Sequence, residues 1–122
     1  MFAEVKAMLP VSGDDYDPQI ITMIKAAALD LTTSAEIELP GTISITRTLE
    51  TATTSEPEHW VITDNSTVKD ELIITAIALW CNMRIGNPPN YDELYTSYNR
   101  LKGQLRLSKK YTRYEGADEV CG

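Results

Sequence analysis

The single histidine, His59, has the clearest capacity for acid–base chemistry in the chain, because its ordinary pKa lies near neutral pH. Nucleophilic catalysis would require a serine or cysteine within hydrogen-bonding distance of it. The sequence has no Ser-x-His or Cys-His spacing that indicates such a pair, and His59 stands beside Trp60 after a polar stretch. We therefore expect a loop residue, and a small enzyme using His59 as its general base stays open as a hypothesis.

Carboxylates gather at three places where they could bind a cation or work as an acid–base pair. Asp14, Asp15 and Asp17 stand close together, but the glycine and final glutamate of a calcium loop are absent at the required spacing. Negative charge near the start of a helix explains them, since the helix dipole favours it. We expect the glutamate pairs at positions 36/38 and 56/58 to be solvated loop charges, so the sequence predicts no catalytic residue.

The two cysteines, Cys81 and Cys121, are far apart in the sequence. Two cysteines and one histidine make a poor zinc ligand set, and their spacing gives no sign of a disulfide framework. Cys81 belongs to an apolar run, whereas Cys121 stands in a polar stretch. We expect one buried and one exposed free thiol, and we predict no metal and no cofactor.

The charges are distributed unevenly along the chain. With 18 acidic and 11 basic residues the net charge is −7, which disfavours bulk attraction to nucleic acid or to an anionic membrane. The local charge is positive over residues 99–113. Three explanations of these basic residues stay open: they stabilise the C-terminus of a helix, they bind duplex DNA, or they contact an acidic surface of another protein. That segment has no acidic residue and six basic ones, Arg100, Lys102, Arg106, Lys109, Lys110 and Arg113.

The hydrophobic spacing predicts a helical beginning to the chain. A short helix is predicted over Phe2–Leu9 and a long one over about Pro18–Ala35, with Asp17 as its N-cap. A second long helix is predicted to begin at residues 65–68 and to reach Met83. Its apolar residues cover well over half of the helix circumference. In so small a domain we expect a partner chain to cover part of that surface.

Two capping boxes are predicted, one from Thr67 and Asp70, the other from Asn90 and Glu93. The second box begins a third long helix, which runs to residue 107. Gly103 interrupts this helix at a cost of ~1 kcal/mol relative to alanine, and it either permits a close helix crossing or is simply tolerated. The helix carries one stripe of tyrosines and leucines, Tyr91, Leu94, Tyr95, Tyr98, Leu101 and Leu105.

The stretch between the first two long helices reads differently. Thr42–Glu50 alternates polar and β-branched residues, which is typical of a strand, and Trp60–Ile62 predicts a returning strand. A lone hairpin is marginal in water, so it must lean on the helices or on another subunit. The predicted fold is thus a mainly helical bundle of three long helices and a short one over residues 1–107. It includes a hairpin-like or extended insertion at about 42–62, and residues 108–122 follow as a C-terminal arm.

The last two helices resemble a known family. The segment AIALWCNMRIGNPPNYDELYTSYNRLKGQLRLSKKY is similar to the final helical pair of the head–tail connector (adaptor) proteins of tailed bacteriophages, some of which are labelled DNA-packaging proteins. The start, LPVSGDDYDPQIITMIKAAALDL, is also similar, and together these cover roughly 75 of the 122 residues. Residues 42–62 depart from the purely helical pattern of the family. The matching residues near the end are Tyr95, Tyr98, Leu101, Lys102, Leu105, Leu107, Ser108 and Tyr111.

The resemblance implies a structural virion protein without enzymatic activity. Such proteins form a homo-oligomeric ring, usually a dodecamer, at the portal vertex of the capsid. The ring connects the portal protein to a stopper or tail-completion protein, and double-stranded DNA passes through it without sequence-specific binding. The implied location is the head–tail interface of the virion, or the host cytoplasm during assembly, and no membrane is involved.

On this interpretation the C-terminal arm docks on the portal, because tyrosine and arginine are enriched at protein interfaces. The alternative is a small nucleic-acid-binding or regulatory module that uses the basic segment 100–113. The residues expected at a subunit or portal interface are Trp80, Tyr95, Arg100, Arg106, Lys109, Lys110, Tyr111, Arg113 and Tyr114.

Overall fold

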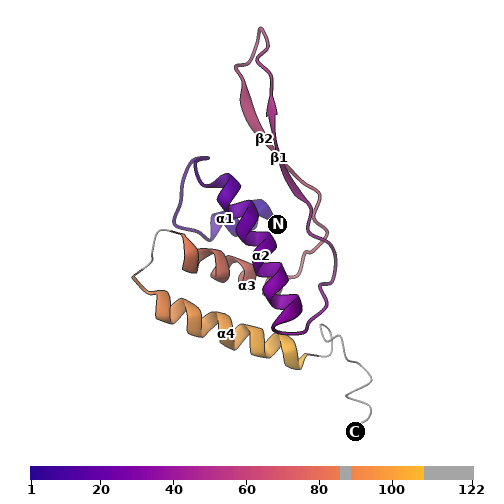
Figure 1. The fold of residues 1–122 in the computed structure, drawn as a ribbon, viewed down its shortest axis with the longest axis vertical. Coiled ribbons are helices and arrows are strands. Elements are labelled where there is room, and N and C mark those ends of the chain that lie inside the picture. Colours follow the sequence, from indigo (N-terminus) through magenta and orange to yellow (C-terminus); the bar gives the residue numbers. More distant parts are fainter. Residues whose placement is uncertain (86–88, 109–122) are drawn as a thin grey trace.

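The computed structural model describes residues 1–85 and 89–108, which form a helical body with a two-stranded hairpin projecting from it (Figure 1). The predicted fold class is confirmed: three long helices, one short helix and one antiparallel hairpin between the first two long helices. Of the helices described, none has both the length and the apolar character needed to span a lipid bilayer. The elements are α1 (Phe2–Ala7), α2 (Asp17–Thr33), β1 (Ile45–Glu50), β2 (His59–Asp64), α3 (Glu71–Arg84) and α4 (Tyr91–Leu107).

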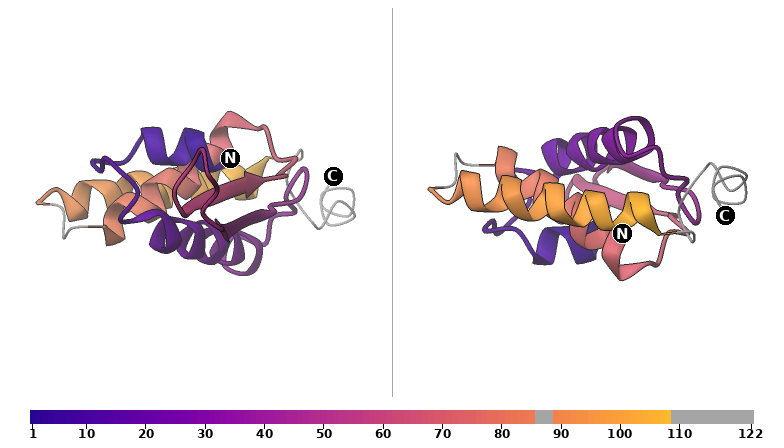
Figure 2. Two further views of the ribbon diagram at one scale, coloured as in Figure 1. Left: turned by 90° about the horizontal axis from the view of Figure 1, so that it is seen from above. Right: turned by 90° about the horizontal axis from the view of Figure 1, so that it is seen from below.

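Helix α3 is the central element of the body, in contact with α1, α2 and α4. In Figure 1, α4 lies below α3, and α1 and α2 lie above it; Figure 2 shows α1 and α2 on opposite flanks of the body. Ile73, Ile77 and Cys81 are fully buried, Trp80 is half-buried, and Leu72 is the large apolar side chain of this helix that stays exposed. The argument that α3 needs a partner chain is therefore wrong. Three neighbours within the same chain cover a helix that is apolar on several sides.

Helix α3 begins later than predicted because the chain before it belongs to the hairpin. The Thr67 N–H donates to the Thr42 carbonyl oxygen, and the Thr67 hydroxyl accepts from the Thr42 N–H at 2.8 Å. Asp70 is the N-cap instead, since its carboxylate accepts from the N–H groups of Leu72 and Ile73. The first predicted capping box is therefore wrong, because Thr67 is hydrogen-bonded to Thr42 and the helix begins only after Asp70.

Two further predicted caps do not form. Asn90 occupies the N-cap position of α4 without a side-chain capping hydrogen bond, so the box with Glu93 is also wrong. Tyr16 occupies the N-cap position of α2, and Asp17 lies one residue inside the helix. The Asp17 carboxylate is buried and accepts from the Lys6 ammonium group at 2.7 Å. It therefore joins α1 to α2 instead of capping a helix.

The base of the hairpin is fixed to the helical body. Ile45 at the start of β1 is 1% exposed and packs in the core, with Ile62 of β2 partly buried nearby. Asp64, at the end of β2, accepts from the N–H groups of Phe2 and Ser66 and pairs with the N-terminal ammonium group at 3.0 Å. Burial opposes ionisation of Asp64, but these hydrogen bonds outweigh it, and the pKa lies well below its ordinary value. The sequence analysis expected the hairpin to lean either on the helices or on another subunit, and the structure shows it supported by the helices.

Gly41 marks the point where the chain turns into the hairpin. Its φ of +153° is a backbone conformation that L residues rarely adopt. A Cβ added here would stand 2.8 Å from the Thr67 hydroxyl oxygen and 3.0 Å from the Val68 backbone nitrogen. Gly41 thus permits the close approach between the segment before β1 and the segment after β2.

Candidate interaction surfaces

Helix α4 packs on the body through a narrow stripe and leaves the rest of its circumference to solvent. Residues of the stripe recur at steps of four and three, which places them on one helix face. Tyr91 and Tyr95, predicted to belong to it, lie at its border and are 44% and 50% exposed. Their rings stack on each other with centroids 6.2 Å apart. The packed residues are Leu94, Tyr98, Leu101 and Leu105.

A polar network joins α4 to α2 beneath this border. The buried Tyr98 hydroxyl donates to an Asp30 carboxylate oxygen, and the Lys102 ammonium group lies 3.3 Å from the same oxygen. Lys102 also donates to the Ser34 hydroxyl at 3.0 Å. Burial raises the pKa of Tyr98 well above its ordinary value, and the hydrogen bond to Asp30 raises it further. Tyr98 therefore stays neutral, and both Tyr98 and Lys102 have structural roles.

Trp80, predicted at an interface, packs within the chain. Its ring lies 5.6 Å from that of Tyr98, and the Arg84 guanidinium stacks over it at 3.4 Å from the ring centroid. Such stacking contributes on the order of 1 kcal/mol at a partly exposed position. The indole nitrogen of Trp80 is buried without a hydrogen-bond partner among the described residues. Trp80 is thus largely a packing residue, covered by an arginine that the sequence did not single out.

The basic end of α4 consists of Arg100, Gly103, Arg106 and Leu107. Arg100, Gly103 and Leu107 follow at steps of three and four, so they share the outer face of the helix. Leu107 is 87% exposed, and an added Cβ at Gly103 would meet no atom within 4 Å. The close helix crossing considered for Gly103 is therefore not formed with any segment of residues 1–85 and 89–108.

The basic residues of α4 differ in how far their charges are compensated. Lys102 is paired with Asp30, as above. The Arg106 guanidinium lies 3.9 Å from the Glu36 carboxylate, and both side chains are largely exposed, so the pair contributes little. Arg100 is exposed, and no ion pair is found for it within residues 1–85 and 89–108. The other predicted interface residues, Lys109, Lys110, Tyr111, Arg113 and Tyr114, lie outside the described residues, as does Cys121.

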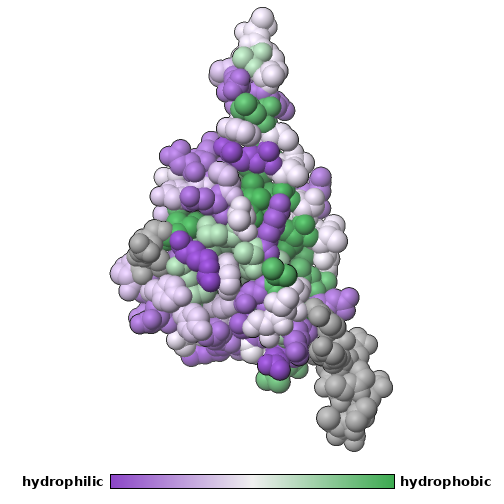
Figure 3. All heavy atoms as spheres, in the orientation of Figure 1, coloured by the Kyte–Doolittle hydropathy of each residue, from purple (hydrophilic) through white to green (hydrophobic). Residues whose placement is uncertain are grey.

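The outer half of the hairpin carries a second exposed surface, which we call the hairpin tip. Leu49 pairs with Trp60 across the strands, so the two side chains share a face, and they are 44% and 50% exposed. The Arg47 guanidinium stacks 3.8 Å from the Trp60 ring centroid. In the space-filling view the hairpin stands clear of the helical body (Figure 3). The tip comprises Arg47, Leu49, Glu50, Glu56, Glu58 and Trp60.

His59 lies in this hairpin, opposite Glu50. Its Nδ1 is 2.9 Å from the Pro57 carbonyl oxygen, and its Nε2 is 3.5 Å from Glu50 and 3.8 Å from Glu56 carboxylate oxygens. The hydrogen bond to Pro57 raises the pKa of His59 above its ordinary value, and the two carboxylates add to this effect. These neighbours accept protons or hydrogen bonds, and none is a hydroxyl or thiol that a base could activate.

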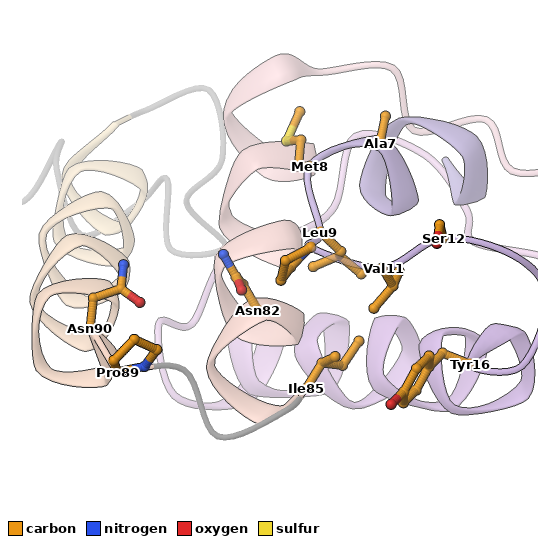
Figure 4. Close-up of a pocket in the computed structure, with 11 residues that line it drawn as sticks. Ala7, Met8, Leu9, Val11, Ser12, Tyr16, Asn82, Ile85, Pro89 and Asn90 are labelled. Atoms are coloured by element: carbon orange, nitrogen blue, oxygen red, sulfur yellow. The ribbon is translucent and has the colours of Figure 1, made fainter.

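A hollow of about 810 Å³ lies between the loop after α1, the end of α3 and the start of α4. Figure 4 shows Leu9 and Val11 in its middle, Asn82 and Tyr16 at its sides, and Asn90 at the α4 end. Among the described residues that line the hollow, Tyr16 has an ionisable side chain and the others are apolar or neutral polar residues. The lining therefore offers packing and hydrogen bonding to a bound group. No pattern in the sequence indicated this hollow, because three segments distant in the chain form it.

Cys81 is fully buried, and burial raises the pKa of its thiol to about 12. The prediction of a buried free thiol at this position is confirmed. Within the described part of the chain, no three His, Cys, Asp or Glu side chains group in a way that could hold a metal ion.

Comparison with known proteins adds no relative: no family model, no curated protein and no solved structure matches the chain. The exposed surfaces of the molecule and the resemblance of its last two helices therefore carry the functional inference.

Proposed function

We propose that the chain is a structural adaptor of a tailed bacteriophage, forming a ring at the portal vertex that connects the portal to the tail or stopper and lets DNA pass. The observation that carries the proposal is the placement of α3 and α4. These helices form the packed pair expected from the resemblance, and α4 lies at the edge of the body with most of its circumference free (Figure 2). An edge helix with exposed tyrosines, arginine and leucine is suited to contact another protein.

The composition of the exposed surfaces supports a protein partner. Tyr91, Tyr95 and Leu107 are large side chains that are 44%, 50% and 87% exposed on one helix, and Arg100 shares the outer face with Leu107 and has no ion pair among the described residues. Apolar and aromatic side chains rimmed by charge are typical of protein interfaces. Duplex binding receives less support, because Lys102 is engaged by Asp30 and the chain as a whole carries −7.

Negative-stain imaging and light scattering of the purified protein, alone and mixed with portal rings from the same phage, test the proposal. We expect ring-shaped particles, or added density on one face of the portal ring. A Tyr95→Ser/Arg100→Glu variant should lose this assembly. A matched Leu29→Ser/Lys25→Glu variant on α2 changes one exposed apolar and one exposed basic residue and should keep it.

Portal rings that stay unchanged, with the chain monomeric beside them, would refute the proposal. Salt-sensitive binding of the isolated chain to duplex DNA, lost on Arg100→Glu, would favour the nucleic-acid-binding alternative.

A further inference from the structure

The two exposed surfaces described above belong to opposite ends of the molecule. The hairpin rises from one end of the helical body, and α4 lies along the other (Figure 1). A rigid chain cannot bring its own hairpin tip onto its own α4. Any contact between these two surfaces must therefore join different copies.

We propose that the hairpin tip of one copy docks on the basic end of α4 of the next copy, so that copies join head to tail. This inference rests on the proposed ring-forming function and specifies the contact that builds the ring. A head-to-tail contact uses two different patches, one from each partner. Such contacts generate closed rings or open chains, whereas two-fold contacts end at a dimer.

Charge complementarity supports this pairing. The hairpin tip carries three acidic residues, Glu50, Glu56 and Glu58, against one basic residue, Arg47, whose guanidinium stacks on Trp60. Residues 99–108 contain three basic residues and no acidic one, and two of these, Arg100 and Arg106, are exposed. Opposite charges across an interface speed association and set its register, while like charges oppose alternative pairings. A tip-to-tip contact would place acidic residues against each other.

Apolar groups on the two surfaces also match. Leu49 and Trp60 are about half exposed on the tip, and Leu107 is almost fully exposed on α4. Gly103, on the outer face of α4 beside Leu107, leaves open space where a side chain would otherwise stand. A flat indole could approach the helix backbone there. An aromatic anchor that becomes buried in such a position is the arrangement found at the centre of many interfaces.

Disulfide cross-linking between engineered cysteines tests the contact directly. The background is Cys121→Ser, in which Cys81 stays unreactive because it is buried and its thiol has a pKa of about 12. One variant adds Glu58→Cys on the tip and a second adds Gln104→Cys on the outer face of α4. A third adds Lys25→Cys on α2 as a matched control, since all three positions are exposed.

We expect little cross-linking of each variant alone and a heterodimer when the first two are mixed under mild oxidation. A chain carrying both Glu58→Cys and Gln104→Cys should give a ladder of oligomers. Efficient dimers of the Glu58→Cys variant alone, or equal yields with the Lys25→Cys control, would overturn the inference.

Charge exchange provides a second test. Glu50→Lys/Glu56→Lys in the Glu58→Cys chain should reduce the heterodimer yield by about tenfold, as should Arg100→Glu/Arg106→Glu in the Gln104→Cys chain, because each places like charges across the contact. Combining the two altered surfaces in one mixture should restore cross-linking. Failure of the combination to recover would count against the pairing.

The outcomes separate this contact from the function that it serves. Rings that form on the portal without tip-to-α4 cross-links would refute the contact and leave the adaptor function standing. Cross-linked ladders from a chain that ignores portal rings would support the contact and refute the adaptor function.

Discussion

Replacement of Tyr98 by phenylalanine isolates the hydrogen bond that ties α4 to α2. The ring is 2% exposed and packs on Trp80, and Tyr98→Phe keeps this packing while removing the hydroxyl that donates to Asp30. A hydrogen bond to a charged acceptor contributes about 1.5–3 kcal/mol. Asp30 retains Lys102, and its side chain is 24% exposed, so we expect the lower part of this range, about 1.5–2 kcal/mol.

Urea unfolding followed by circular dichroism measures this change in the free energy of unfolding. In a domain of this length, about 1 kcal/mol corresponds to a shift of about 4 °C in the melting temperature. The predicted loss is therefore about 6–8 °C in a thermal melt of the monomer. Tyr91→Phe is the control, since its ring is 44% exposed and it should change the free energy by less than about 0.5 kcal/mol.

A double-mutant cycle with Asp30→Asn identifies the cause of the loss. If the hydroxyl acts through Asp30, the sum of the losses in free energy of unfolding in the two single variants should exceed the loss in the double variant. The difference, which is the coupling energy, should be about 1 kcal/mol. Additive losses, or a Tyr98→Phe variant as stable as the original chain, would refute the reasoning. In that case the apolar stripe and the Lys102 contacts, and not the Tyr98 hydroxyl, would hold the helix on α2.

Three further changes test other parts of the structure. Because the pKa of Asp64 is lowered on folding, the stabilisation that Asp64 gives the fold is fully present above the ordinary aspartate pKa and is lost as the pH falls towards the folded pKa. Asp64→Asn should cost about 2 kcal/mol at pH 7. Urea titrations below pH 4 should show a smaller difference in stability between the variant and the original chain. Equal losses at pH 7 and pH 3 would contradict this, and Asp15→Asn on the surface is the control. Gly41→Ala should destabilise the fold by about 1–3 kcal/mol through strain and the contact with Thr67, whereas Gly103→Ala should stabilise the monomer by up to about 1 kcal/mol. Thermal melts compare the two, and a Gly103→Ala variant that melts lower than the original chain would argue that the glycine has a role in the isolated monomer.

Local pattern was sufficient to predict the elements of this fold. The apolar spacing in α2, α3 and α4 and the alternation around β1 each reflect a repeat of the backbone, so neighbouring residues alone reveal them. The boundaries were less predictable. Thr67 has a good capping sequence, yet it pairs with Thr42, and only contacts between segments far apart in the chain decide between these outcomes.

The candidate surfaces were predictable in part. The sequence identified Tyr95, Arg100 and Arg106 as surface candidates, and all three are exposed on α4. It also selected Trp80, which packs against Tyr98, and it overlooked Leu49 on the hairpin. Composition and spacing indicate what a side chain is suited to contact, but they do not indicate whether its own chain already supplies that contact.

The sequence by itself determined the mainly helical class, the hairpin and the amphipathic character of the edge helix, because each follows from the periodicity of nearby residues. Tertiary structure alone decided that α3 is covered by three neighbours in the same chain and that the hairpin tip and the basic end of α4 face away from each other. Burial depends on which distant segments meet, since the hydrophobic effect is non-directional and acts on whatever apolar surface lies close in space.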